Sequence, residues 1–175
     1  MNNVAVMALT IAAATVVSAQ PPTLRFSAPK EWTVTPSSSS MRVAQYALPR
    51  APGDAEDGEL IVYFFGGQGG SVQANLDRWL GQMEQPDGRP SKAVATTEVL
   101  TVSGMKVTVL DVSGKYVAEM APGSPTRYNK PGFRLKAAVV ETTGGPYFVK
   151  LTGPAKTVER WNTAFATFLK SASYR

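Results

Sequence analysis

The chain has 175 residues, carries 18 Lys and Arg against 13 Asp and Glu, and contains neither Cys nor His. The lack of both residue types excludes disulfides, thiol nucleophiles, Ser-His-Asp and Cys-His catalytic arrangements, and the usual zinc sites. It also excludes a bacterial lipoprotein, because no cysteine can carry the lipid. An enzyme would depend on Asp, Glu, Lys, Tyr, Ser or Thr, or on a bound cofactor, and nothing in the sequence indicates a cofactor or a metal.

The first 19 residues predict a signal peptide. Val4–Val17 is an apolar run without charge, and it ends in Val17-Ser18-Ala19, which places small residues at the −3 and −1 positions of a cleavage site. The run is shorter than the roughly 20 apolar residues of a membrane-spanning helix. We therefore expect cleavage between Ala19 and Gln20, a periplasmic or secreted protein, and no transmembrane anchor after cleavage.

Residues 20–175 suit a single domain. Their charge is uneven, since residues 20–105 hold seven Lys and Arg against nine Asp and Glu, whereas residues 106–175 hold eleven against four. A basic half favours an anionic partner such as a lipid headgroup, a polyanionic glycan or an acidic protein, and general solubility is the alternative. Nucleic acid is not expected as the partner of an exported protein without a recognisable binding motif.

Two strands and a helix are predicted in the first half of this domain. Residues 41–48 alternate apolar and polar side chains at their start, as a strand exposed on one face does, and residues 59–65 form a continuous apolar run typical of a central strand. Ser71 can cap a following helix over 72–83. The apolar stripe of that helix consists of Val72, Leu76, Trp79, Leu80 and Met83.

Two hairpins and a closing helix are predicted in the second half. The predicted strands are 93–102, 106–117, 133–142 and 147–152. Ser103-Gly104 and residues 143–146 supply the hairpin turns. Pro154 fits the first turn of the helix. The apolar face of this helix consists of Val158, Trp161, Phe165, Phe168 and Leu169. Antiparallel strands with amphipathic helices outside them predict an α+β layered sandwich.

Two segments resemble a known family. Phe26-Ser27-Ala28-Pro29-Lys30-Glu31-Trp32 resembles the opening of PsbP-like and DcrB-like domains, and Phe148–Pro154, running into an aromatic amphipathic helix, resembles their final strand and helix. The resemblance is to an uncharacterised bacterial exported branch, and it implies an antiparallel sheet between helices. Family members include photosystem accessory proteins, bacterial envelope proteins and a nuclear-import factor that binds a GTPase, and most are not enzymes. No family site has matching residues in this chain.

Three short motifs each have a functional and a structural interpretation. Residues 66–71 are glycine-rich between a strand and a helix, but they lack the Lys-Ser/Thr of a phosphate loop and indicate a tight turn. Residues 54–59 are acidic without the spacing of a calcium loop, which predicts a solvated, mobile loop. Ser103 and Lys106 match a serine–lysine nucleophile motif, yet they lie in a predicted turn without the companion motifs.

The irregular segment 118–132 is the best candidate for a binding site. Arg127, Lys130 and Arg134 surround Tyr128 there, and an aromatic ring among cations on a loop is typical of a recognition surface. These four residues are the predicted contacts for an anionic partner or an envelope protein. The alternative is a solvated connector with a basic strand edge, which prevents edge-to-edge aggregation.

These observations favour an exported, non-catalytic binding or accessory module of the cell envelope. One alternative is a carboxylate-dependent enzyme that acts on an extracellular substrate such as a glycan, which needs two carboxyl groups about 5–9.5 Å apart. Another is a protein that binds a hydrophobic small molecule between sheet and helix, which needs an enclosed apolar pocket of roughly 300 Å³ or more.

Overall fold

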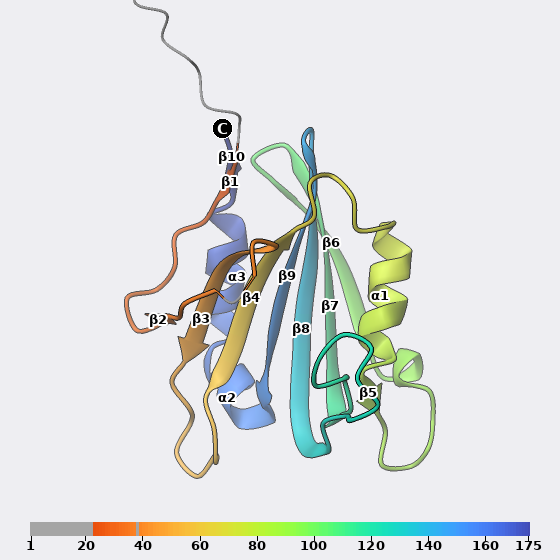
Figure 1. Cartoon of the computed structure of the whole chain (residues 1–175). Helices are drawn as coiled ribbons and strands as arrows, with labels where there is room; N and C mark the ends of the chain where they lie inside the picture. The colour runs from red at the N-terminus through yellow and green to blue at the C-terminus, as the bar shows by residue number, and fades with distance from the viewer. Residues whose placement is uncertain (1–22, 38) are drawn as a thin grey trace, which may run out of the picture.

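The computed structural model describes residues 23–37 and 39–175, so the predicted signal peptide lies outside the described residues. Its main sheet contains β2 (Thr33–Val34), β3 (Arg42–Leu48), β4 (Gly58–Phe64), β5 (Met83–Glu84), β6 (Thr96–Val102), β7 (Met105–Tyr116), β8 (Lys130–Thr142) and β9 (Gly145–Pro154). The order is β2-β3-β4-β9-β8-β7-β5, with β6 also paired to β7, and every pairing is antiparallel (Figure 1). A second small sheet pairs β1 (Leu24–Arg25) with β10 (Ser173–Tyr174).

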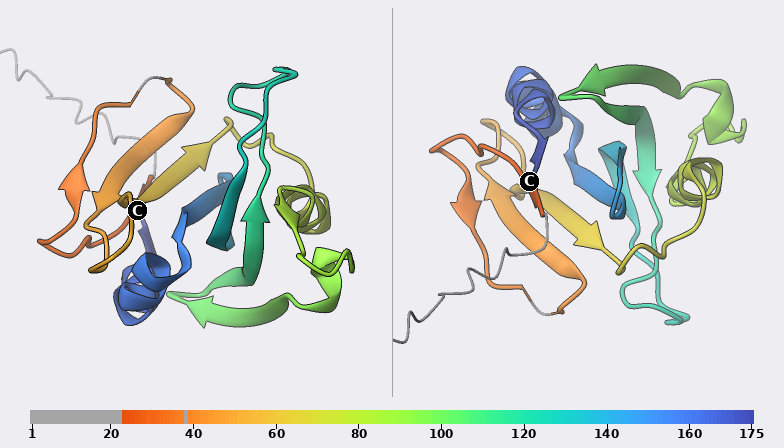
Figure 2. Two further views of the ribbon diagram at one scale, coloured as in Figure 1. Left: turned by 90° about the horizontal axis from the view of Figure 1, so that it is seen from below. Right: turned by 90° about the horizontal axis from the view of Figure 1, so that it is seen from above.

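Helices lie on both faces of the main sheet. The helix α1 (Val72–Leu80) covers one face, and α2 (Ala155–Arg160) and α3 (Asn162–Lys170) cover the other, while η1 (Ser91–Ala93) leads into β6. Figure 2 shows the two groups of helices on opposite sides, with β6 curving out of the plane of the sheet toward α3. The predicted α+β sandwich is therefore confirmed. No helix in the described part of the chain is long and apolar enough to cross a membrane.

The core under α2 and α3 is rich in aromatic residues. Trp32 packs edge-on against Trp161 at 6.3 Å between ring centroids, and it lies 5.3 Å from Phe168. Alternate residues of the central strands meet these rings from the sheet, because successive strand side chains point to opposite faces. The fully buried members from β3, β4 and β9 are Leu48, Leu60, Val62, Val149 and Leu151.

The core under α1 is smaller. Leu76 and Trp79 are buried against β7, β8 and Phe148 of β9. The side-chain oxygen of Ser71 accepts a hydrogen bond from the Ala74 N–H at 3.2 Å, so Ser71 is the N-cap that the sequence predicts. The sheet contributes Leu110, Val112, Leu135, Ala137, Val139 and Phe148 to this core.

Several element boundaries differ from the prediction, and β8, for example, begins at Lys130 and not at residue 133. The closing helix is divided at Trp161, whose φ of −96° and ψ of 7° interrupt the helical backbone, while its indole N–H donates to the Pro49 carbonyl at 2.8 Å. The first helix ends at Leu80 because Gly81 favours helix termination. Met83 therefore leaves the predicted helical stripe and is buried in β5, where it pairs with Tyr116. Ala93 is the last residue of η1, and the strand starts only at Thr96.

The turn interpretations of two motifs are confirmed. Ser103 and Gly104 have φ of 49° and 77°, as a tight hairpin requires, and the Ser103 hydroxyl donates to the Ala172 carbonyl at 2.9 Å. Lys106 lies 3.6 Å from Glu141, so these residues form no nucleophile pair. In the glycine-rich turn, Gly67 lies so close to the backbone of Gly145 that a Cβ added at Gly145 would overlap it.

The acidic segment at residues 54–59 is exposed at Ala55, Asp57 and Glu59, as the predicted solvated loop would be, but its acids also make specific contacts. The Asp54 carboxylate accepts hydrogen bonds from the Thr157 N–H at 2.9 Å and the Thr157 hydroxyl at 2.6 Å, and so it caps α2 from outside the helix. Asp57 accepts from the Arg50 N–H at 3.0 Å, and Glu56 forms an ion pair with Lys130. Asp54 and Glu56 thus hold the β3–β4 loop against α2 and β8, while Asp57 forms a hydrogen bond within the loop.

Replacement of Trp161 by alanine should destabilise the protein. The side chain is buried against Trp32 and the sheet, and truncation of a large buried aromatic residue costs about 3–5 kcal/mol of unfolding free energy. Urea unfolding of wild type and Trp161→Ala measures the difference. A loss below about 1 kcal/mol would show that the face assigned to the closing helices is wrong.

Candidate functional site

The structure divides the predicted partner-binding residues between two faces. Tyr128 stacks on Tyr116 at 5.4 Å, and the Lys130 ammonium lies 5.2 Å from the centre of the Tyr128 ring, so these residues do come together. Arg134 follows the inward-facing Phe133 on β8 and therefore points to the α2 side of the sheet. Arg127 lies in the exposed loop, where its backbone bridges to Glu119.

Each cation of this region faces a carboxylate. Arg127 lies 3.7 Å from Glu119, and Lys130 forms its ion pair with Glu56 from the first half of the chain. The pairs on the α2 side are Arg134 with Asp111 and Glu159, and Lys136 with Asp111. Four cations and four carboxylates thus balance, and the basic excess of residues 106–175 does not appear as a basic surface here. Partner binding by Arg127, Tyr128, Lys130 and Arg134 stays a prediction.

Arg134 belongs to a fixed charge network. Its guanidinium donates to both oxygens of Asp111, at 2.7 Å and 2.6 Å, and Lys136 donates to the same carboxylate at 2.7 Å. Burial alone would raise the pKa of Asp111, but the hydrogen bonds from Arg134 and Lys136 lower it below its usual value. Asp111 and Arg134 also line a cavity of about 320 Å³ beside the edge of β7. The network keeps both groups charged and fixes their geometry.

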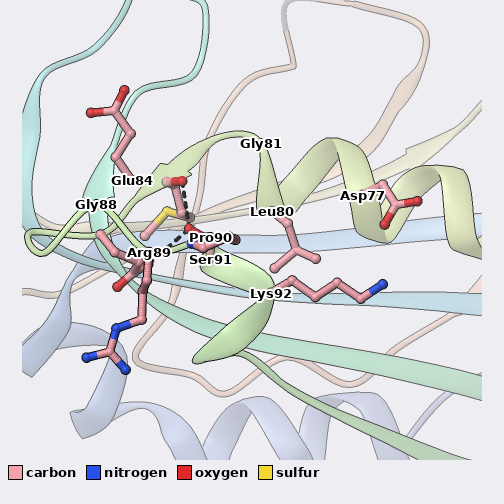
Figure 3. Close-up of a pocket in the computed structure, with 11 residues that line it drawn as sticks. Asp77, Leu80, Gly81, Glu84, Gly88, Arg89, Pro90, Ser91 and Lys92 are labelled. Carbon is pink, nitrogen blue, oxygen red and sulfur yellow. Dashed lines mark hydrogen bonds between the residues drawn. The ribbon is translucent and has the colours of Figure 1, made fainter.

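A second cavity, of about 470 Å³, lies between the end of α1 and η1 (Figure 3). Leu80, Met83 and Pro90 give it apolar walls, but charged residues of both signs surround it. These residues are Asp77, Glu84, Arg89 and Lys92. It therefore differs from the enclosed apolar pocket that a binder of hydrophobic molecules would need.

Half of the sheet face on the α1 side has no helix over it. The helix α1 contacts β7 and β8, and the register places Ile61, Lys150 and Ala137 in one row across β4, β9 and β8. The row continues to Gln45 on β3. On β3, β4 and β9 this face carries mostly polar side chains in place of the apolar ones beneath α1. We call this surface the open half-face, and its polar members are Arg42, Gln45, Glu59, Tyr63, Lys150 and Thr152, with the buried Ile61 between Gln45 and Lys150.

Lys150 lies at the boundary between the open half-face and the covered half. Its partly buried ammonium donates to the Gln82 side-chain oxygen at 2.6 Å and to the Tyr116 hydroxyl at 2.9 Å. The nitrogen also lies 5.1 Å from the centre of the Tyr116 ring. Within the described residues no carboxylate lies within 4.0 Å of it. Lys150 therefore differs from Lys130, Lys136 and Arg134, which are all ion-paired.

Burial lowers the pKa of the Lys150 ammonium to about 8. Glu59 raises this pKa, whereas Arg78 on α1 and Arg42 on β3 lower it further, so both arginines lie close enough to repel the ammonium. Burial raises the pKa of Tyr116, and its phenol therefore stays neutral. At neutral pH the site is a cationic amine among neutral acceptors, which suits it to hold an anion.

Sequence reasoning missed Lys150. Residues 148–154 entered that reasoning as a predicted strand and through the family resemblance, but the single lysine between apolar neighbours was not considered. Lysine is almost never fully buried unless it is paired, so its place in an apolar segment was the available signal. The lysine can be identified as partly buried only when β9 is known to lie between β4 and β8.

No protein-family model matches the chain, and no curated protein matches it in sequence. Among solved structures, a protein of unknown function from Pseudomonas aeruginosa, PA94, is similar at a TM-score of 0.50 and 12% identity, over 83% of this chain and 98% of that one. LpqN, involved in cell envelope biogenesis of Mycobacterium tuberculosis, has a TM-score of 0.49 and 14% identity, and the match covers 87% of this chain and 83% of that one. PsbP from Synechocystis has a TM-score of 0.49 and 12% identity, and the match covers 94% of this chain and 98% of that one. The likeness to PA94 concerns the fold alone, an antiparallel sheet with helices.

Replacement of Lys150 by methionine should stabilise the protein at pH 7. The lowered pKa means that charged Lys150 opposes folding, and a methionine of similar volume removes that penalty, for a gain of about 1–2 kcal/mol in unfolding free energy. In wild type the unfolded chain holds this proton up to its ordinary pKa near 10.5, while the folded chain releases it near 8. Wild-type stability should therefore rise from pH 7 to about pH 9.5.

Urea unfolding across this range measures both effects. The rise with pH should disappear in Lys150→Met and persist in Lys170→Met, which changes an exposed lysine on α3. Work above pH 10 is avoided, because the raised pKa values of Tyr46, Tyr63 and Tyr116 act in the opposite direction there. A Lys150→Met protein that is less stable at pH 7 and keeps the wild-type pH dependence would contradict the assignment.

Proposed function

We propose that this chain is an exported, non-catalytic binding or accessory module of the cell envelope, and that it meets its partner through the open half-face. The observation that carries the proposal is the unpaired, partly buried ammonium of Lys150 on a sheet surface without a covering helix. A buried charge without a counter-ion disfavours folding, and a ligand of opposite charge would remove that penalty.

The composition of the open half-face supports a binding role. Tyr and Arg are enriched at the centres of protein interfaces, where they contribute much of the binding energy. Here Arg42 lies 5.9 Å from the centre of the Tyr63 ring, and Tyr63 stacks on Phe65 at 5.9 Å. All three side chains are partly exposed. The surface thus offers rigid aromatic groups beside cations.

Structural roles of the candidate catalytic motifs support the absence of catalysis. The Ser103 hydroxyl is held by the Ala172 carbonyl, and Lys106 is directed to Glu141. In the acidic loop, Asp54 caps α2. Each motif that could suggest chemistry therefore has a place in the architecture.

Export is tested by the mature amino terminus. The Val17-Ser18-Ala19 site predicts that the isolated protein begins at Gln20. Intact-mass and amino-terminal analysis of protein recovered outside the cytoplasm measures this. A chain that begins at Met1 and stays in the cytosol would contradict the proposal.

The binding face is tested by photo-crosslinking in the cell that makes the protein. A photoreactive amino acid at Gln45 or Glu59 should form an adduct with a partner, because Gln45 lies in the same row as Lys150 and Glu59 pairs with Thr152 on the same face. Thr167 on α3 and Thr97 on β6 are exposed and serve as matched control positions. Mass spectrometry identifies the adducts. Equal adducts from all four positions, or none from Gln45 and Glu59, would overturn the assignment of the face.

A further inference from the structure

The Lys150 ammonium has one donor to spare. An ammonium group has three N–H donors, of which one points to the Gln82 side-chain oxygen and one to the Tyr116 hydroxyl. Both acceptors are neutral, so neither compensates the charge. A third donor and a full positive charge are left for a group that approaches from the open half-face.

Two further cations flank this ammonium without a carboxylate of their own. Arg42 donates to the Gln45 side-chain oxygen at 3.0 Å, and Arg78 donates to the Asn75 side-chain oxygen. In the described part of the chain neither arginine has an acid within 4.0 Å. The nearby acid is Glu59, which accepts a hydrogen bond from Gln45 at 2.9 Å. Three cations and one carboxylate leave a net positive charge at this place.

We propose that the open half-face recognises a carboxylate, presented by an Asp or Glu side chain of a partner protein, with Lys150 as its direct hydrogen-bond donor. Arg42 and Arg78 supply the flanking positive charge. This inference rests on the proposed function, since it names the chemistry by which the same face selects its partner.

The donors at the site suit a carboxylate better than a phosphate. Phosphate sites are built from several backbone N–H groups at a helix amino terminus or in a glycine-rich loop. Around Lys150 the backbone N–H groups of β4, β8 and β9 are used by the sheet. The nearby end of α1 is its carboxyl end, since Gln82 follows the C-cap Gly81, and that end carries partial negative charge. A singly charged group with two oxygens matches one ammonium donor and flanking guanidinium groups.

The shape of the surface favours a protein as the occupant. Small molecules are held in concave sites that bury most of their surface. Both cavities described above lie elsewhere, one between α1 and η1 and one beside β7, and neither includes Lys150. The open half-face extends over the neighbouring strands β3, β4 and β9, and the stacked Tyr63 and Phe65 rings lie at one end of it. A protein surface with a central acidic side chain can cover such a face.

Binding of a carboxylate has a spectroscopic signature at Lys150. A bound anion stabilises the charged amine, so the pKa of Lys150 should rise from about 8 toward its ordinary value near 10.5. The titratable and charged groups that face Lys150 are Tyr116 from β7, Glu59 from β4, Arg42 from β3 and Arg78 from α1. Tyr116 stays neutral over this range, because burial raises its pKa.

The test uses the full mature chain and a twelve-residue oligoglutamate peptide as the probe. NMR titration near pH 7 and about 150 mM salt measures binding, and the resonances of Lys150 measure its pKa with and without the peptide. We expect the peptide to raise the pKa of Lys150 and to bind at least about ten-fold more weakly to Lys150→Met. Lys170→Met, which removes one exposed charge from α3, should bind as wild type does. Inorganic phosphate, added to the same total negative charge as the peptide, should leave the pKa of Lys150 nearly unchanged.

Several results would overturn the proposal. These are equal binding of the peptide by wild type and Lys150→Met, an unchanged pKa of Lys150 at saturation, no binding at millimolar peptide, or a larger effect of phosphate than of the peptide. Backbone NMR spectra confirm that each variant is folded. If the wild-type protein forms no adducts from Gln45 and Glu59, the binding face itself is wrong. Adducts that persist at full strength in Lys150→Met would leave the face in place and defeat only the carboxylate.

Discussion

The antiparallel pairing of β4 with β9 is the constraint on which both cores depend. The pairs Val62–Val149 and Leu60–Leu151 direct their side chains to α2 and α3, while the intervening pair Ile61–Lys150 directs its side chains to the α1 side. A slip of one residue would exchange every side chain between the two faces. The lysine would then be placed among the aromatic rings of the larger core, so the register also fixes where the charge is tolerated.

The width of the sheet explains why one half-face stays open. Neighbouring strands are about 4.8 Å apart, and a helix with its side chains is about 10 Å wide. The single helix α1 can therefore cover about two strands, and it contacts β7 and β8. The opposite face is closed by α2 and α3, by the curvature of β6 and by the segment that carries Trp32 (Figure 2). On the α1 side the remaining strands carry mostly polar residues, with Ile61 as a buried exception.

Much of the architecture could be predicted from the sequence, because hydrophobic period and turn chemistry are local properties. Both hairpins, the cap at Ser71 and the buried face of the closing helices follow from them. The break at Trp161 does not follow from the local pattern, and the hydrogen bond of its indole to the Pro49 carbonyl joins residues more than one hundred positions apart. The short strands β1, β2, β5 and β10 have only two residues each and exist through long-range pairing. The same reason applies to the charged residues: Glu56 and Lys130 are 74 positions apart, so a count along the chain could not show their pairing.

The ion pairs make Lys150 more informative than the excess of basic residues in its half of the chain. Exposed pairs such as Arg127–Glu119 contribute little to stability, yet they cancel the local charge that could attract an anionic partner. Lys150 has the opposite character, because burial makes its charge unfavourable to the folded state and no acid in the described chain forms an ion pair with it, although Glu59 favours its charged form. A charge of this kind gains most from a counter-ion that arrives with a partner, since water around it is already largely displaced. The strongest anion attraction on this molecule should therefore come from one poorly solvated lysine in the sheet, and not from its most basic loop.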